Sequence, residues 1–281
     1  MIHQEFDFNH FNTKFYGQYW QADTTKAVVI LVHGMGEHST RYTDSVIPKL
    51  LQHHISVIAY DQFGHGRTEG KRGHNPGYDA VLDCIKIIAL KAAKVFGNKP
   101  TFLYGHSMGG NVIINYVLRR EHHFVGVLAT SPFLKLAFDP PLWKVSIGKI
   151  LQKIAPAMTM ANELDVTAIS RDKLEVQKYI DDPLVHDRIS PNYSITFMET
   201  GSWAIKNAAK LTVPMLVLHG TGDRLISYNA SKEFVKNSNG KALLKLFENG
   251  YHELHNDLCK EEMINTLINW IETQLKTQPK S

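Results

Sequence analysis

The stretch that decides the fold is TFLYGHSMGG at residues 101–110. Its first four residues form a short β-rich run, the next six a glycine-rich turn around Ser107, and a helical pattern follows from Asn111 to Arg120. Gly-x-Ser-x-Gly between a strand and a helix is the arrangement that presents a nucleophilic serine. The glycines let the chain turn sharply enough to strain the serine backbone and expose its hydroxyl. Without the flanking elements the pattern would fit an ordinary glycine-rich turn, so these elements carry the prediction that Ser107 is catalytic.

Short apolar runs recur on both sides of this stretch. They cover residues 14–21, 27–32, 55–60, 214–219 and 242–247. Uninterrupted apolar runs are typical of strands that are buried on both faces of a parallel sheet. Residues 41–53, 78–95 and 262–275 instead have apolar side chains at helical spacing. The alternation predicts an α/β fold with helices on both faces of a mostly parallel sheet.

The alternation stops between Ser131 and about Trp203. Apolar residues recur there at helical spacing before Pro156, and no convincing strand follows. The helical stripe consists of Trp143, Ile147, Ile150, Leu151 and Ile154. We therefore expect a mainly helical insertion at residues 132–202, carried by a core that residues 1–131 and 203–281 form together.

Composition narrows the class of protein. With 281 residues, 43% of them hydrophobic, the chain can bury the core of one domain that carries an insertion. The net charge of +4 comes from 31 basic and 27 acidic side chains without a dense basic block, which argues against nucleic acid as a partner. No segment reaches the ~18 apolar residues that a membrane-spanning helix needs.

Two features bear on the compartment of the protein. The N-terminal residues lack the basic start and the apolar run of a secretory signal. The two cysteines, Cys84 and Cys259, lie within helical patterns, which indicates reduced thiols and not a disulfide framework. We expect a cytoplasmic protein. A chain from which a signal peptide had been removed would look the same.

A serine nucleophile needs a base within hydrogen-bond reach and a carboxylate that orients the base. The run at residues 214–219 leads into Asp223, and the run at residues 242–247 leads into His252. Both side chains thus follow predicted strand ends, where the sites of α/β sheets collect, and both follow Ser107 in the expected order. Taken alone, Asp223 also fits a turn-forming residue, and His255 lies only three residues beyond His252 among the 15 histidines.

An oxyanion hole is the other part that such a site requires. One donor is the amide of the residue after the nucleophile, here Met108. The second comes from the loop after an early strand, and residues 27–32 lead into the flexible segment HGMG at residues 33–36. Met35 is the candidate for the second donor, although an ordinary turn would fit this segment as well.

With these residues the chain resembles the monoglyceride lipase and lysophospholipase branch of the α/β-hydrolases. The matching segments are HGMGEH at residues 33–38 with Arg41 and Tyr42, DQFGHGRTEG at 61–70, GHSMGG at 105–110, DPL at 182–184, HGTGD at 219–223 and YHELH at 251–255. They span nearly the whole chain and are specific for the branch, though not for one substrate. Thr68 replaces the serine that is usual in this branch, and residues 132–202 match only loosely.

The resemblance implies an eight-stranded, mostly parallel sheet with a helical cap at residues 132–202 above an acyl-chain tunnel. It implies the same triad and the same oxyanion amides. It also implies that Glu37, Arg41 and His255 surround the polar end of the pocket and that Tyr179 of the cap faces the site. The loose match of the cap leaves the acyl-chain length and the head group of the substrate open.

The function that follows is hydrolysis of a carboxylic ester, first of all a monoacylglycerol, to fatty acid and glycerol through an acyl-Ser107 intermediate. No cofactor and no metal are implied. A lysophospholipase or a broad-specificity carboxylesterase would use the same machinery. A non-catalytic binding module is the alternative from another class, but such modules typically lose a triad member, and all three are present here.

The apolar stripe of the insertion bears on the partners of the protein. Lys144, Lys149 and Lys153 lie largely off the stripe, a pattern that suits a helix at a lipid surface and equally a helix packed on the core. The apolar residues just before the stripe favour the lipid surface. We expect a lipid ester as substrate and contact with membranes through the cap, so that the cytoplasmic protein is peripheral to the membrane.

Overall fold

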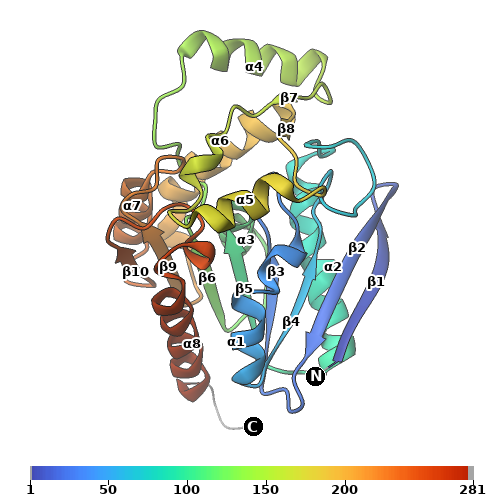
Figure 1. The fold of residues 1–281 in the computed structure, drawn as a ribbon, viewed down its shortest axis with the longest axis vertical. Coiled ribbons are helices and arrows are strands. Elements are labelled where there is room, and N and C mark those ends of the chain that lie inside the picture. The colour runs from blue at the N-terminus through green and yellow to red at the C-terminus, as the bar shows by residue number, and fades with distance from the viewer. Residues whose placement is uncertain (1, 278–281) are drawn as a thin grey trace.

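The computed structural model describes residues 2–277, which fold around one eight-stranded sheet (Figure 1). Its strand order is β1-β2-β4-β3-β5-β6-β9-β10. The strands are β1 (Ile2–His10), β2 (Thr13–Gln21), β3 (Ala27–Val32), β4 (Ile55–Tyr60), β5 (Thr101–His106), β6 (Gly126–Thr130), β9 (Met215–Gly220) and β10 (Ala242–Phe247). β2 pairs antiparallel with β1 and with β4, and all other neighbouring strands pair parallel, which confirms the predicted mostly parallel sheet of eight strands.

Helices cover both faces of the sheet and explain why its central strands are mostly apolar. The side chains of β3 alternate between two buried clusters, with Ile30 in one and Leu31 in the other. The first cluster contains side chains of α2 (Tyr78–Phe96), α3 (Met108–Arg119), α6 (Pro191–Asn207) and α7 (Tyr228–Asn237), and the second those of α1 (Val46–Gln52) and α8 (Lys260–Thr277). Every residue of β3 is buried, as in a strand with a core on each side.

The region for which one helix was predicted, residues 41–53, contains two shorter ones. A 3-10 helix, η1, spans Ser39–Tyr42, and α1 begins at Val46. Pro48 explains the break, because proline has no N–H for the bond to residue 44 and its ring collides with the carbonyl there. A helix in this region therefore has to begin close to Pro48, where a proline in the first turn is tolerated.

The chain between β6 and β9 forms the upper part of the molecule in Figure 1. It contains α4 (Leu142–Ile154), β7 (Met160–Ala161), η2 (Val166–Ala168), α5 (Lys173–Asp181), β8 (Arg188–Ile189), α6 and η3 (Ala208–Lys210). The short antiparallel pair of β7 and β8 was not predicted. The predicted boundary at residue 202 falls inside α6, whose buried side packs on α3, where the side-chain amide of Asn111 donates to the carbonyl of Phe197 at 3.3 Å.

Two further observations concern the cysteines and the helices. Cys84 is buried and Cys259 is partly buried, and both are free thiols. Among residues 2–277, no helix is both long enough and apolar enough to cross a bilayer. Residues 278–281, at the end of the chain, lie outside its described part.

Candidate active site

Ser107 lies in the tight turn between β5 and α3, and its backbone has φ 52° and ψ −114°. This is the left-handed region, which non-glycine residues enter only where the surroundings impose it. A Cβ at Gly109 would collide with the carbonyl oxygen of Val32, so only glycine lets the turn approach β3 this closely. The Ser107 amide donates to the Thr130 carbonyl at 2.9 Å, which holds the strained residue from the neighbouring strand β6. The strain predicted from the motif is therefore present.

The side chains of His252 and Asp223 meet at the carboxyl ends of β10 and β9. His252 Nδ1 lies 2.7 Å from Asp223 Oδ2, and both side chains are buried. The two strands are parallel neighbours, which brings their following loops to the same edge of the sheet. The other carboxylate oxygen of Asp223 accepts the amides of Leu225 and Ile226 at 2.8 and 3.0 Å, so the carboxylate is held in place.

His219 is a partner of this pair that sequence reasoning missed. Its Nε2 lies 3.1 Å from Asp223 Oδ2, and its Nδ1 lies 2.8 Å from the hydroxyl of Ser231. The ring is fully buried at the end of β9. A histidine four residues before the predicted acid was the available signal, but 15 histidines made any one of them uninformative.

The charges of the pair stabilise each other. Burial raises the pKa of Asp223, but the charge of His252 and the hydrogen bonds from His219 and His252 outweigh burial and hold this pKa far below its usual value. For His252 burial lowers the pKa, and the charge and hydrogen bond of Asp223, followed by the charges of Glu253 and Glu37, raise it above its usual value. An ionised Asp223 accepts from Nδ1–H, which leaves Nε2 of a neutral His252 free to accept a proton.

A small cavity brings the candidate residues together. Its walls are Gly34, Met35, Glu37, His106, Ser107, Leu164, Ile169, Tyr179, His252 and Glu253, from both the core and the segment between β6 and β9. Its volume is about 30 Å³. That is room for a water molecule and far below the ~300 Å³ of ordinary ligand pockets. The acyl-chain tunnel that the resemblance implies is thus not open at Ser107 in this structure.

The two residues expected to supply the oxyanion amides, Met108 and Met35, lie at the start of a helix and in a turn. Met108 is the first residue of α3, so its amide belongs to the helix start, which has no intrahelical acceptor. Met35 lies in the turn after β3 and lines the cavity. The turn approaches the nucleophile closely, since a Cβ at Gly34 would lie 3.3 Å from the Cβ of Ser107. Two amides that flank a nucleophile can stabilise an oxyanion in a water-poor site.

A buried charge cluster lies beside the cavity. Arg41 donates to both carboxylate oxygens of Glu253 at 2.7 and 2.9 Å and to Glu37 at 3.0 Å. Glu37 also accepts the amide of Gly34 at 2.6 Å, and the guanidinium of Arg41 stacks 4.7 Å above the ring of Tyr179 in α5. Glu253 was not predicted as a site residue, because nothing in the sequence links it to a residue 212 positions earlier.

The structure separates the four predicted substrate-binding residues into two layers. Glu37 and Tyr179 line the cavity, whereas Arg41 and His255 are not among its walls. His255 is fully buried, its ring stacks on Tyr42 at 4.6 Å, and neither ring nitrogen has a hydrogen-bond partner among the described residues. Burial lowers the pKa of His255 to about 3, so the ring is neutral at neutral pH.

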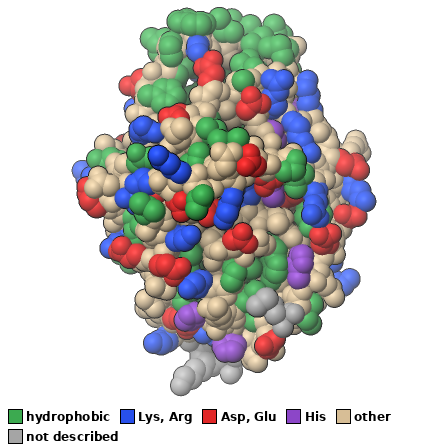
Figure 2. Space-filling model, viewed as in Figure 1, with side chains coloured by type: hydrophobic (Ala, Val, Ile, Leu, Met, Phe, Trp, Pro, Cys, Tyr) green, Lys and Arg blue, Asp and Glu red, His purple; other side chains and the backbone are tan. Residues whose placement is uncertain are grey.

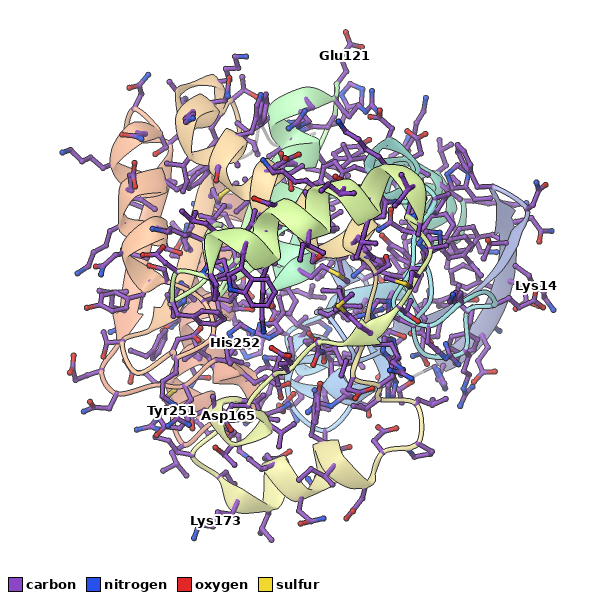
Figure 3. The ribbon with its side chains drawn as sticks, turned by 90° about the horizontal axis from the view of Figure 1, so that it is seen from above. Lys14, Glu121, Asp165, Lys173, Tyr251 and His252 are labelled. Atoms are coloured by element: carbon purple, nitrogen blue, oxygen red, sulfur yellow. The ribbon has the colours of Figure 1, made fainter. Side chains whose placement is uncertain are left out.

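Figure 3 shows the site from above, with His252 and Tyr251 labelled near Asp165 of the segment between β6 and β9. Arg224 connects the two parts, because it pairs with Asp165 at 3.3 Å and lies 5.3 Å above the ring of Tyr251. Across residues 2–277 there is no group of three or more histidine, cysteine, aspartate or glutamate side chains that could hold a metal ion.

Known proteins resemble the chain over most of its length. The model of the family described as serine aminopeptidase, S33, matches residues 23–259. A monoacylglycerol lipase of Mycolicibacterium smegmatis is 31% identical over 91% of this chain and 92% of its own. The crystal structure of Paleococcus ferrophilus monoacylglycerol lipase is 32% identical with a TM-score of 0.86, over 92% of this chain and 99% of that one. An uncharacterized abhydrolase domain-containing protein of Dictyostelium discoideum is 36% identical over 89% of this chain, which spans only 27% of that protein's length.

Proposed function

The chain belongs to the family described as serine aminopeptidase, S33, and we propose that this member cleaves monoacylglycerols to fatty acid and glycerol through an acyl-Ser107 intermediate. It has the α/β-hydrolase fold and is a carboxylic-ester hydrolase. The observation that carries the proposal is the 2.7 Å contact between His252 and Asp223 beside a strained Ser107 in the same cavity. The relatives named as monoacylglycerol lipases support the choice of substrate.

The proposed reaction has two halves. Nε2 of His252 takes the proton of the Ser107 hydroxyl as its oxygen attacks the ester carbonyl, and Asp223 stabilises the imidazolium. The amides of Met35 and Met108 stabilise the oxyanion of the tetrahedral intermediate. His252 then gives the proton to the leaving glycerol oxygen, and the acyl group stays on Ser107. In the second half, His252 takes a proton from water as the water oxygen attacks the acyl carbonyl. His252 then gives this proton to the leaving Ser107 oxygen, which releases the fatty acid and restores the hydroxyl.

In this proposal, residues of the charge cluster recognise the polar end of the substrate. Tyr179 and Glu37 line the cavity, where they can contact the glycerol part. Outside the cavity wall, Arg41 donates to Glu37 and His255 stacks on Tyr42. No hydrogen bond from the Tyr179 hydroxyl is found among the described residues, so this hydroxyl is free to pair with a glycerol hydroxyl. A site built to bond hydroxyls discriminates against esters that lack them.

We further propose that residues 132–202 form a cap that must move to admit an acyl chain. The cavity of about 30 Å³ cannot hold such a chain, and three of its walls, Leu164, Ile169 and Tyr179, come from this segment. Helix α4 is the outermost element of the segment (Figure 1). Figure 2 shows hydrophobic side chains gathered at the same end of the molecule.

This apolar end is the proposed contact with a lipid surface. On α4 the large apolar side chains are exposed, with Leu142 at 84%, Trp143 at 62% and Ile154 at 74%. Exposed apolar surface of this kind usually marks a contact site, and lysines beside it favour an anionic lipid surface. Docking there would deliver a single-chain lipid to the cap, so the protein would be peripheral to the membrane.

The substrate proposal is tested by a hydrolysis panel. It compares monoacylglycerols of several acyl-chain lengths with diacyl- and triacylglycerols, lysophosphatidylcholine, a fatty-acid methyl ester and an amino-acid p-nitroanilide. We expect monoacylglycerols to give the highest kcat/KM. Higher kcat/KM with lysophosphatidylcholine would identify a lysophospholipase, similar values for all esters a broad carboxylesterase, and preference for the p-nitroanilide the peptidase that the family description names. Any of these results would contradict the proposal.

A further inference from the structure

We propose that Glu253 is a positioning residue for the catalytic base: its paired contact with Arg41 fixes the loop that carries His252 and keeps that loop in place when the cap moves. This inference rests on the proposed function, in which His252 is the base. It assigns a role to a residue that lines the same cavity as Ser107 but does not belong to the triad.

The contact between Glu253 and Arg41 is geometrically specific. The two terminal guanidinium nitrogens, Nη1 and Nη2, donate one to each carboxylate oxygen, at 2.7 and 2.9 Å. The side chain of Asn256 adds a third donor to Glu253 at 2.9 Å. Side-chain exposure is only 6% for Arg41 and 4% for Glu253. A two-point contact between planar groups, shielded from water, fixes orientation as well as distance.

The contact acts on His252 through one peptide unit. The carbonyl of His252 accepts the hydroxyl of Ser131 at 2.8 Å, and the amide of Glu253 donates to the carbonyl of Ile169 at 2.7 Å. The backbone at His252 and Glu253 is therefore held from the core by Ser131, from the cap by Ile169, and through the Glu253 side chain by Arg41. Removing one of the three anchors loosens the imidazole relative to Ser107.

The three anchors differ in what happens to them when the cap moves. Ile169 and Tyr179 lie in the segment between β6 and β9, so the bond from Glu253 to Ile169 and the stacking of Arg41 on Tyr179 are lost when this segment opens. Arg41 and Glu253 both belong to the core, and their contact remains. Ser131 also belongs to the core, so two anchors persist: Ser131 holds the carbonyl of His252, and Arg41 holds the side chain of the residue next to the base.

The same carboxylate also acts on the base electrostatically. Burial raises the pKa of Glu253, but the charge and hydrogen bonds of Arg41 outweigh burial and hold it at about 2, so Glu253 is ionised at any working pH. Its negative charge is one of the causes that raise the pKa of His252. The other ionisable groups around His252 are Asp223 after β9, Glu37 and Arg41 near η1, His106 in β5 and His255 in η4 (Leu254–Asn256).

The alternative is that the ion pair serves stability alone. Buried ion pairs are often worth little to stability, yet breaking one by removing a partner is costly. Loss of stability in a Glu253 variant would therefore not distinguish the two roles. A change in the kinetics of the folded variant would distinguish the two roles.

The test is Glu253→Gln, which keeps the shape of the side chain and removes its charge. The readouts are kcat and KM for a water-soluble butyrate ester across pH, on protein shown to be folded by circular dichroism. We expect kcat to fall about 10- to 100-fold, the range in which small misplacements of a catalytic group act, with KM changing far less. The acidic limb of kcat/KM should move to lower pH, because a lost negative charge makes the imidazolium less stable.

Asp257→Asn is the matched control. Asp257 also holds this loop, because it accepts the amide of Tyr251 at 2.9 Å and pairs with Arg171 at 2.9 Å, but it does not line the cavity. This variant should lose stability and keep the position of the acidic limb. A Glu253→Gln protein with wild-type kcat and an unmoved limb would overturn the inference. Ester hydrolysis by the wild-type protein in the same assay shows that such a failure does not extend to the proposed function.

Glu253→Asp covers the case in which Glu253→Gln does not fold. It keeps the charge but shortens the side chain, so the two-point contact with Arg41 cannot form with the same geometry. We expect a lower kcat with an acidic limb close to that of the wild-type protein. Wild-type kcat in this variant would overturn the positioning role.

Discussion

The backbone of Ser107 is strained because its surroundings leave the chain no relaxed path. Glycines at 105 and 109 allow a closer approach than any side chain would, and Phe133 donates its amide to the Ser107 carbonyl at 2.9 Å. Positive-φ backbone at a non-glycine residue costs on the order of 1–3 kcal/mol. The strain fixes the direction of the hydroxyl. A substitution that retains the Cβ at this position leaves the backbone conformation unchanged.

The first prediction concerns the triad. Ser107→Ala and His252→Ala should each lower ester turnover by roughly 10⁶-fold, because triad members act as a unit. Asp223→Asn should cost less, on the order of 10⁴-fold, since it disturbs the tautomer of the base and leaves the nucleophile in place. Initial rates on a soluble ester measure all three. Wild-type turnover in Asp223→Asn together with inactivity of Asp257→Asn would show that the acid was assigned wrongly.

The second prediction concerns Tyr179, whose hydroxyl we propose to pair with glycerol. Tyr179→Phe removes only this hydroxyl and leaves the ring on Arg41. We expect kcat/KM for a monoacylglycerol to fall up to about 10-fold, as for one hydrogen bond worth about 1 kcal/mol. The methyl ester of the same fatty acid is the control, because it lacks the glycerol hydroxyls. An equal loss with both esters would exclude a role of this hydroxyl in recognition.

The residues of the site differ in how far the sequence could predict them. Asp223 and His252 follow apolar runs, so a local pattern placed both at strand ends, and in the structure their side chains are 2.7 Å apart. Glu253 and Arg41 meet only because the carboxyl ends of β10 and β3 lie at the same end of the sheet. This depends on strand order and not on any local pattern. His255 was predicted in the polar pocket, yet its burial behind Tyr42 depends on packing that spacing does not encode.

At the scale of single elements, α4 shows what helical periodicity can and cannot predict. The spacing predicted the helix and its apolar stripe. The structure has α4 at Leu142–Ile154, with Leu151 of the stripe partly buried and its other four residues exposed. The pattern could not decide between core and solvent, because an amphipathic helix has the same spacing in both settings. Contact with α6 uses other residues, among them Gly148, whose missing side chain leaves room for Ile195.

The third prediction is made for this helix. Trp143→Glu combined with Ile147→Glu should weaken binding to anionic liposomes and lower turnover of dispersed long-chain monoacylglycerol, because charge replaces the apolar contact. Hydrolysis of a soluble short-chain ester should stay nearly unchanged. Cosedimentation with liposomes and initial rates on both substrates measure these effects.

A matched control is available on α5. Leu174→Glu combined with Ile180→Glu also replaces two exposed apolar residues, 74% and 54% exposed, in another helix of the same segment. This variant should bind liposomes like the wild-type protein. Equal loss of both activities in the α4 variant would show that the stripe supports the cap structure, and unchanged liposome binding would end the docking proposal.

At the scale of the whole molecule, the position of a strand in the sheet only partly determines whether its sequence reveals it, because the buried strand β6 was not predicted and the edge strand β10 was. The central strands β3, β4 and β5 lie between two cores and are mostly apolar and buried, so they stood out as runs. The edge strand β1 is mostly exposed and was not predicted. The same difference in burial should appear in the free energy of unfolding.

The last prediction compares one substitution at two places in the sheet. Leu103 in β5 is fully buried, whereas Leu243 in the edge strand β10 is 58% exposed. Leu103→Ala should lower the free energy of unfolding by about 2–5 kcal/mol, the usual cost of deleting a buried leucine side chain and leaving a cavity. Leu243→Ala should change it by less than about 0.5 kcal/mol, as for a surface site. Urea unfolding followed by tryptophan fluorescence measures both, and similar losses for the two variants would contradict the assignment of β5 to the centre and β10 to the edge.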